Sequence, residues 1–180
     1  MRTFGRRLIQ AATLDPNFYD DCIDNRRLVW PALLIVVAGG VAGVLGQYIG
    51  RDFEVDALLE RMLRATLIWT LGWPVLAGTA FAVGRWILGG TGAFGGVFRG
   101  MGWAFTPGLL QIASALPPLQ FVAFAVPMVW MVATGMVATG RTLRISSSRA
   151  MIATLLAWGV WGVVGIVLMV IQGTFPSFTT

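Results

Sequence analysis

The residues best suited to chemistry in this chain are three aspartates, Asp20, Asp21 and Asp24, which form the pattern DDxxD. On a helix, residues three and four apart share a face, so these carboxylates could together hold a hard cation such as Mg²⁺. The same pattern binds magnesium in prenyl-diphosphate enzymes, but such a site needs a second acidic cluster, and no acid follows Glu60. We therefore interpret the aspartates as a solvated charged turn and expect no metal.

Few other residues are suited to catalysis. The chain has no histidine, which removes the commonest general base and the usual protein ligand of haem and zinc. Its one cysteine, Cys22, has no partner for an internal disulfide. With no set of residues for general acid–base catalysis, we predict a protein that is not an enzyme and that binds no cofactor.

A glycine-rich stretch at residues 90–95, GTGAFG, formally matches the dinucleotide-binding pattern GxGxxG. That pattern works only after a strand, before a helix and with a later acid for the ribose. No acid follows it, and no strand pattern precedes it. We interpret it as a turn or loop between two helices.

Composition indicates the class of protein. Hydrophobic residues make up 57% of the 180 residues and charged residues 12%, the balance of a polytopic membrane protein. All 13 basic residues are arginine, and they lie at the ends of apolar runs, as the positive-inside rule predicts. We therefore expect no binding to nucleic acid, although the formal net charge is +5.

The apolar runs predict an all-α membrane bundle with five transmembrane helices. These cover residues 28–49, 65–83, 101–116, 119–140 and 150–171. Together they form a membrane domain, 28–171, in which the double proline at 117–118 separates the third and fourth spans. The third span would be only about 24 Å long, so it either crosses fully or forms a re-entrant hairpin with the fourth.

Arginine counts predict the orientation. With the N-terminus in the cytoplasm, the inner segments hold ten arginines and the outer segments three. We therefore expect an N-in/C-out protein with a cytoplasmic amphipathic segment, 1–27, and an outer tail, 172–180. The first part of 1–27 either lies on the membrane surface as a helix or frays into water, and Asp15-Pro16 predicts the start of a second helix.

Four glycines of the first span are candidate helix-packing residues. They form two pairs four residues apart, at Gly39, Gly43, Gly46 and Gly50. Small residues at this spacing let another helix approach closely. The approaching helix is either another span of the same chain or a second copy of the protein.

Three arginines between the last two spans are candidate contacts for lipid headgroups or a partner protein. They are Arg141, Arg144 and Arg149, which surround three serines. An arginine near an anionic membrane surface contributes about 1 kcal/mol to binding.

Several stretches resemble one known family. They are LDPNFYDD at 14–21, RRLVWPALLIV at 26–36, LGGTGAFGGVFRGMGWAFTPGLL at 88–110, ALPPLQ at 115–120 and LRISSSRAMIATLL at 143–156. This pattern, over roughly 14–171, resembles the Yip family of small five-span membrane proteins, in its bacterial branch. The resemblance implies a helical bundle with a cytoplasmic N-terminus. Eukaryotic members are associated with Rab-type GTPases, a role of which this short N-terminal segment gives no sign.

Together these observations predict a non-enzymatic protein of the bacterial inner membrane. It would act through contacts with membrane lipids, other membrane protein subunits or a second copy of itself, as an accessory subunit of a larger complex. The alternative is a transporter or channel for a small neutral solute, in which Gln111 lines the path.

Overall fold

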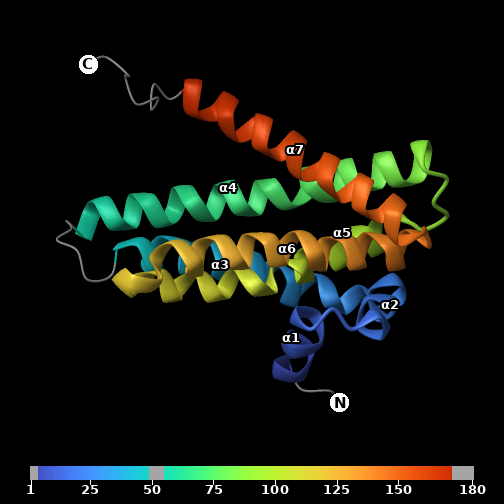
Figure 1. Cartoon of the computed structure of the whole chain (residues 1–180), viewed down its shortest axis with the longest axis horizontal. Coiled ribbons are helices and arrows are strands. Elements are labelled where there is room, and N and C mark those ends of the chain that lie inside the picture. The colour runs from blue at the N-terminus through green and yellow to red at the C-terminus, as the bar shows by residue number, and fades with distance from the viewer. Residues whose placement is uncertain (1–3, 49–54, 172–180) are drawn as a thin grey trace.

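A computed structural model describes residues 4–48 and 55–171, and every regular element among them is a helix (Figure 1). The α-helices are α1 (Phe4–Ala12), α2 (Pro16–Asp24), α3 (Val29–Tyr48), α4 (Val55–Ala82), α5 (Phe94–Ala104), α6 (Gln120–Leu143) and α7 (Ser147–Ile171). The short helices are the 3-10 helices η1 (Arg26–Leu28), η3 (Thr106–Ala115) and η4 (Pro117–Leu119) and the π-helix η2 (Val83–Ile87). The predicted all-α bundle is confirmed; Gly50 and the tail 172–180 lie outside the described residues.

Four helical segments are long and apolar enough to cross a membrane. They are Arg26–Tyr48, Leu58–Ile87, Gln120–Leu143 and Ser147–Val167. The shortest has 21 residues, or about 31 Å, which matches a hydrocarbon core of about 30 Å. Large apolar side chains on their outer faces are exposed, as lipid contact requires. The chain is therefore an integral membrane protein.

The third predicted span, 101–116, is not a single α-helix, because α5 gives way to the 3-10 helix η3. Pro107 has no N–H to donate to the carbonyl of Trp103, and the Thr106 hydroxyl donates to that carbonyl instead, over 2.7 Å. In Figure 1 α5 and η3 follow one another along the bundle, and η3 packs against α3 and α6. At the rises of the two helix types they are together about 36 Å long, enough for a full crossing.

The second predicted span, 65–83, belongs to a longer helix. α4 has 28 residues and continues through Pro74. Residues 55–64, before the predicted span, and the span itself therefore belong to one helix that begins at Val55. Four leucines with a spacing of four residues are exposed along it, at Leu59, Leu63, Leu67 and Leu71. This spacing places them on one face, which suits contact with lipid.

The N-terminal helices dock on the bundle. In Figure 1 α1 and α2 lie beneath the other helices, and α2 packs against α5 and α6. Phe18, Tyr19 and Cys22 are 0% exposed, so one face of α2 is fully buried there. Within the described residues, the segment 1–27 is thus folded against the membrane domain and not frayed.

The start of α2 is as predicted. The carboxylate of Asp15 accepts a hydrogen bond from the Asn17 amide over 3.0 Å, and Pro16 occupies the first helical turn. An aspartate in this position satisfies a backbone amide that has no partner within the helix. The cap and the proline together fix where α2 begins.

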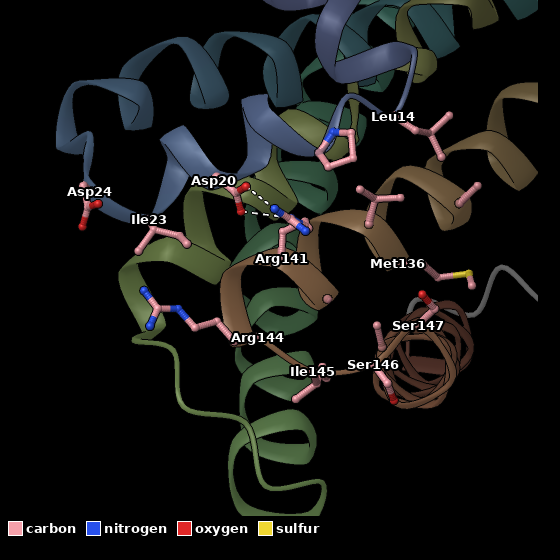
Figure 2. Close-up of a pocket in the computed structure, with 15 residues that line it drawn as sticks. Leu14, Asp20, Ile23, Asp24, Met136, Arg141, Arg144, Ile145, Ser146 and Ser147 are labelled. Atoms are coloured by element: carbon pink, nitrogen blue, oxygen red, sulfur yellow. Dashed lines mark hydrogen bonds and ion pairs between the residues drawn. The ribbon is translucent and has the colours of Figure 1, made fainter.

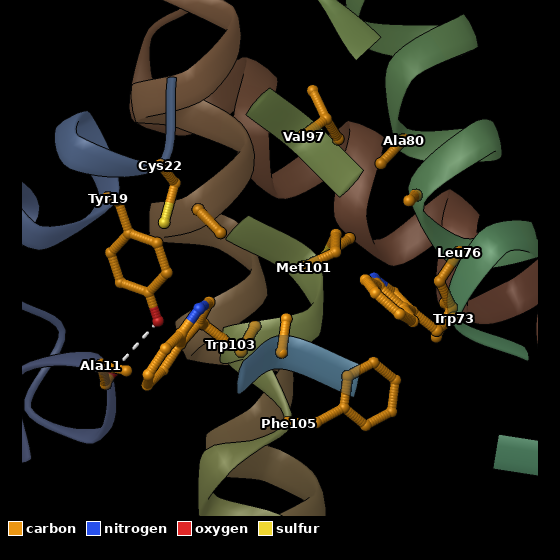
Figure 3. Packing of buried hydrophobic residues seen from close by; sticks show 14 of the residues in the cluster. Ala11, Tyr19, Cys22, Trp73, Leu76, Ala80, Val97, Met101, Trp103 and Phe105 are labelled. Atoms are coloured by element: carbon orange, nitrogen blue, oxygen red, sulfur yellow. Dashed lines mark hydrogen bonds between the residues drawn. The ribbon is translucent and has the colours of Figure 1, made fainter. Parts of the chain in front are cut away.

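Trp103 connects the N-terminal helices to α5. Its side chain is 0% exposed, its indole N–H donates to the Leu28 carbonyl over 3.1 Å, and the Phe18 ring lies 4.9 Å away. Beside it the Tyr19 hydroxyl donates to the Ala11 carbonyl over 3.0 Å (Figure 3). The Trp103 indole N–H and the Tyr19 hydroxyl therefore both have hydrogen-bond partners, as polar groups in a low-dielectric interior require.

Candidate functional site

A groove of about 890 Å³ opens between α2, the end of α6 and the start of α7 (Figure 2). Its polar side chains are Asp20, Asp24, Arg141, Arg144, Ser146 and Ser147. Its apolar wall includes Leu14, Ala133, Met136 and Val137. The groove thus presents charges of both signs beside an apolar surface, a combination that suits an amphiphilic ligand.

Arg141 is paired with α2 across this groove. Its Nε donates to Oδ1 of Asp20 over 3.0 Å, and a terminal nitrogen donates to Oδ2. The two side chains are 47% and 38% exposed, so solvent screens the pair, and it contributes less than about 1 kcal/mol to stability.

Among the residues that the structure describes, no group of three or more histidine, cysteine, aspartate or glutamate side chains could hold a metal ion.

Arg144 ends α6 in a left-handed conformation, with φ 55° and ψ 45°. The Ile145 amide donates to the Gly140 carbonyl over 3.1 Å, and the Arg144 amide donates to the Arg141 carbonyl over 3.4 Å. This is the Schellman arrangement, which usually has glycine where Arg144 stands. A left-handed residue with a side chain costs roughly 1–2 kcal/mol, so the turn itself would be more stable with glycine.

Arg149 contacts the glycine-rich loop and does not line the groove. Its guanidinium donates to the Leu88 carbonyl over 3.1 Å. In the same loop the amides of Gly90 and Thr91 donate to backbone carbonyls, at 2.8 and 3.0 Å. The GxGxxG stretch at 90–95 therefore uses these two amides inside the protein and does not present them to a phosphate.

The glycines of the first span lie at close helix contacts within the chain. A Cβ at Gly39 would lie 3.5 Å from the Trp69 ring of α4. A Cβ at Gly43 would lie 2.9 Å from Oε1 of Gln111 in η3, and one at Gly46 would overlap the Gln111 carbonyl. In the structure the helices that approach α3 at these glycines are thus α4 and η3 of the same chain.

One partly buried arginine was not predicted from the sequence. Arg99 on α5 donates to the Cys22 carbonyl over 2.8 Å and to the Ile23 carbonyl over 2.7 Å, which ties down the end of α2. Burial beneath this contact raises the pKa of the Cys22 thiol to about 12. The thiol is therefore protonated at neutral pH, and its nucleophilicity is low.

The comparison with family models decides the family. The model of the Yip1 domain matches residues 12–169, which is most of the chain. The chain belongs to the Yip1 domain family. No curated protein matches it, and no solved structure matches it. The resemblance to the Yip family that the sequence predicted is thus confirmed.

The last helix of this Yip1 domain has an unpacked face that we did not predict. A Cβ at Gly159, Gly162 or Gly165 of α7 would meet no atom within 4 Å. Figure 1 shows α7 diverging from α4 toward its end, and a cleft of about 330 Å³ between them is lined in part by Trp69 and Trp161. The available signal was the spacing of three glycines in the part of this helix that follows Arg149 and carries no charge.

Proposed function

We propose that this Yip1 domain protein is a non-enzymatic accessory subunit of a larger assembly in the bacterial inner membrane. It lies N-in/C-out and acts through contacts with partner membrane helices and with lipids. The observation that supports this best is the open face of α7, because a span packed only against its own bundle would bury its small residues. The glycines of α3 lie at close contacts within the bundle, whereas the three glycines of α7 leave room for a partner helix.

The contrast between two glycine positions supports a partner on α7. At Gly72 of α4 a Cβ would lie 2.5 Å from the Trp161 ring, so this glycine permits a close contact within the chain. Gly162 lies one residue after Trp161, and a Cβ there would meet no atom within 4 Å. Small residues on an exposed apolar helix allow the backbone of a second helix to approach, which is how membrane helices associate without a hydrophobic driving force.

The test is purification from native membranes in mild detergent. We expect the wild-type protein to co-purify with one or more membrane proteins at fixed stoichiometry, and the Gly162→Leu variant to lose them, because leucine blocks close approach. Gly78→Leu is the matched control, since a Cβ at Gly78 also meets nothing within 4 Å but lies on α4. A monomer without a reproducible partner would contradict the proposal, as would equal co-purification by both variants.

One observation favours the alternative function, a path for a small neutral solute. Gln111 is 2% exposed, and its side-chain nitrogen has no acceptor among the described residues. An unpaired amide inside a helix bundle costs free energy unless a polar molecule forms a hydrogen bond with it. Flux of a neutral solute into liposomes that disappears with Gln111→Leu, and persists with Ser114→Ala, would support this function over the first.

A further inference from the structure

The groove between α2, α6 and α7 is lined by two exposed side chains of opposite charge, Asp24 and Arg144, of which Asp24 interacts electrostatically with Arg99. Neither side chain makes a hydrogen bond or ion pair within the part of the chain that the structure describes. In the same groove Arg141 and Asp20 satisfy one another. Figure 2 shows the Arg144 guanidinium and the Asp24 carboxylate on the same side of the groove, with Ile23 near both. A ligand with one negative and one positive group would complement both side chains.

The conformation of Arg144 indicates that its side chain has a role other than forming the turn. The Schellman turn at the end of α6 favours glycine, and Arg144 adopts a φ of 55° that side chains rarely take. Its guanidinium also stabilises no described protein group. An arginine in such a position suits recognition of a phosphate, with which it forms strong, directional hydrogen bonds.

The apolar wall of the groove continues along the lipid-facing side of α6. Met136 and Ala133 line the groove, and successive residues on the same face are exposed, at Val129, Val126 and Val122. Their spacing of three and four residues places them on one side of the helix. This stripe begins beside the charged end of the groove and follows the helix across the hydrocarbon region. An acyl chain is the ligand part that matches such a surface.

We propose that the groove binds one phospholipid whose headgroup carries a phosphate and a primary amine, as in phosphatidylethanolamine. The phosphate lies on Arg144, the ammonium on Asp24, and an acyl chain on the exposed face of α6. The inference rests on the lipid contacts of the proposed function and adds the lipid class and the residues.

The balance of charge selects the headgroup. An anionic headgroup would satisfy Arg144 but would leave Asp24 unpaired or repel it. A quaternary ammonium cannot donate a hydrogen bond to the Asp24 carboxylate, whereas a primary ammonium donates up to three. We therefore expect a preference for phosphatidylethanolamine over phosphatidylglycerol and phosphatidylcholine with the same acyl chains.

The experiment is native mass spectrometry of the delipidated full-length protein with each of these three lipids and, separately, with phosphoethanolamine alone. We expect the wild type to bind phosphatidylethanolamine about tenfold more tightly than the other two. Arg144→Gly should weaken binding of all three lipids about tenfold while the fold becomes slightly more stable, because glycine suits the turn. Asp24→Asn should remove the preference for the amine and leave the phosphate contact.

The controls separate the possible sources of a signal. Arg6→Gln removes an exposed arginine of α1 that does not line the groove, and it should leave lipid binding unchanged. Equal affinity of the wild type for the three lipids, or unchanged binding by Arg144→Gly, would overturn the proposal. Phosphoethanolamine alone binding as tightly as the lipid would overturn the role of the α6 stripe. Gly162→Leu tests the binding of partner proteins to the glycine face of α7, whereas Arg144→Gly tests the binding of lipid in the groove. One of the two proposals can therefore fail while the other holds.

Discussion

Arg99 donates a hydrogen bond to the backbone carbonyl of Cys22 over 2.8 Å, although 77 residues separate them. A second bond to the Ile23 carbonyl, at 2.7 Å, makes the contact bidentate. The two carbonyls belong to the last turn of α2, where backbone acceptors lack partners within the helix and a cation is favoured. The arginine therefore fixes the docking of α2, and the only cysteine of the chain lies where it can report on that docking.

Replacing Arg99 with glutamine should expose Cys22. Without the two bonds α2 loosens from α5, the thiol regains water, and its pKa falls from about 12 toward the ordinary range. Because the thiolate is the reactive form, labelling by a maleimide at pH 8 should become more than about tenfold faster. Arg6→Gln, on the exposed part of α1, is the control and should label as slowly as the wild type. Equal labelling rates for all three proteins would contradict this role of Arg99.

Alanine at Gly46 should destabilise the bundle. The new Cβ would overlap the Gln111 carbonyl, which belongs to the backbone and cannot rotate away. Such overpacking typically costs about 1–3 kcal/mol. The measurement is the unfolding midpoint in detergent, compared with Gly78→Ala, where the Cβ meets no atom within 4 Å and the better helix propensity of alanine adds up to about 1 kcal/mol. A Gly46 variant as stable as the Gly78 variant would show that α3 and η3 do not pack as described.

Phenylalanine at Trp103 should also lower stability. It removes the indole N–H that donates to the buried Leu28 carbonyl, and an unpaired buried acceptor costs about 1–3 kcal/mol. Trp86→Phe is the matched control, because Trp86 is 77% exposed. Circular dichroism during thermal unfolding in detergent measures both. Similar losses in the two variants would indicate a general effect of tryptophan replacement.

The ion pair between Asp20 and Arg141 should contribute little to the free energy of unfolding. Both side chains are more than one third exposed, and double-mutant cycles on such pairs give about 0.2–1 kcal/mol. The cycle of Asp20→Asn, Arg141→Gln and the double variant, read from unfolding in detergent, should give a coupling energy in this range. It should shrink at high salt, because the ions screen exposed charges. A larger, salt-independent coupling would mean that the pair is buried by a ligand or partner.

Much of the architecture was predictable because lipid imposes a simple rule on sequence. Long uncharged runs such as 119–140 must be helices, since every backbone polar group needs a partner within its own segment. Local signals also predicted that α2 starts after Asp15. The region around Pro107 was harder: the missing N–H was evident, but not that Thr106 would satisfy the free carbonyl and let a 3-10 helix continue.

The sequence by itself determined that this chain is a bundle of apolar helices of the Yip1 family with arginines at the ends of its spans. Only the tertiary structure decided which of those arginines have partners: Arg141 faces Asp20 and Arg149 faces Leu88, while the Arg144 side chain has no partner among the described residues. The physical reason is that hydropathy and capping act over a few residues, whereas the partner of a charge 121 residues away depends on how the helices pack. The same holds for α7, because only the structure shows that a Cβ at Gly159, Gly162 or Gly165 would meet no atom within 4 Å.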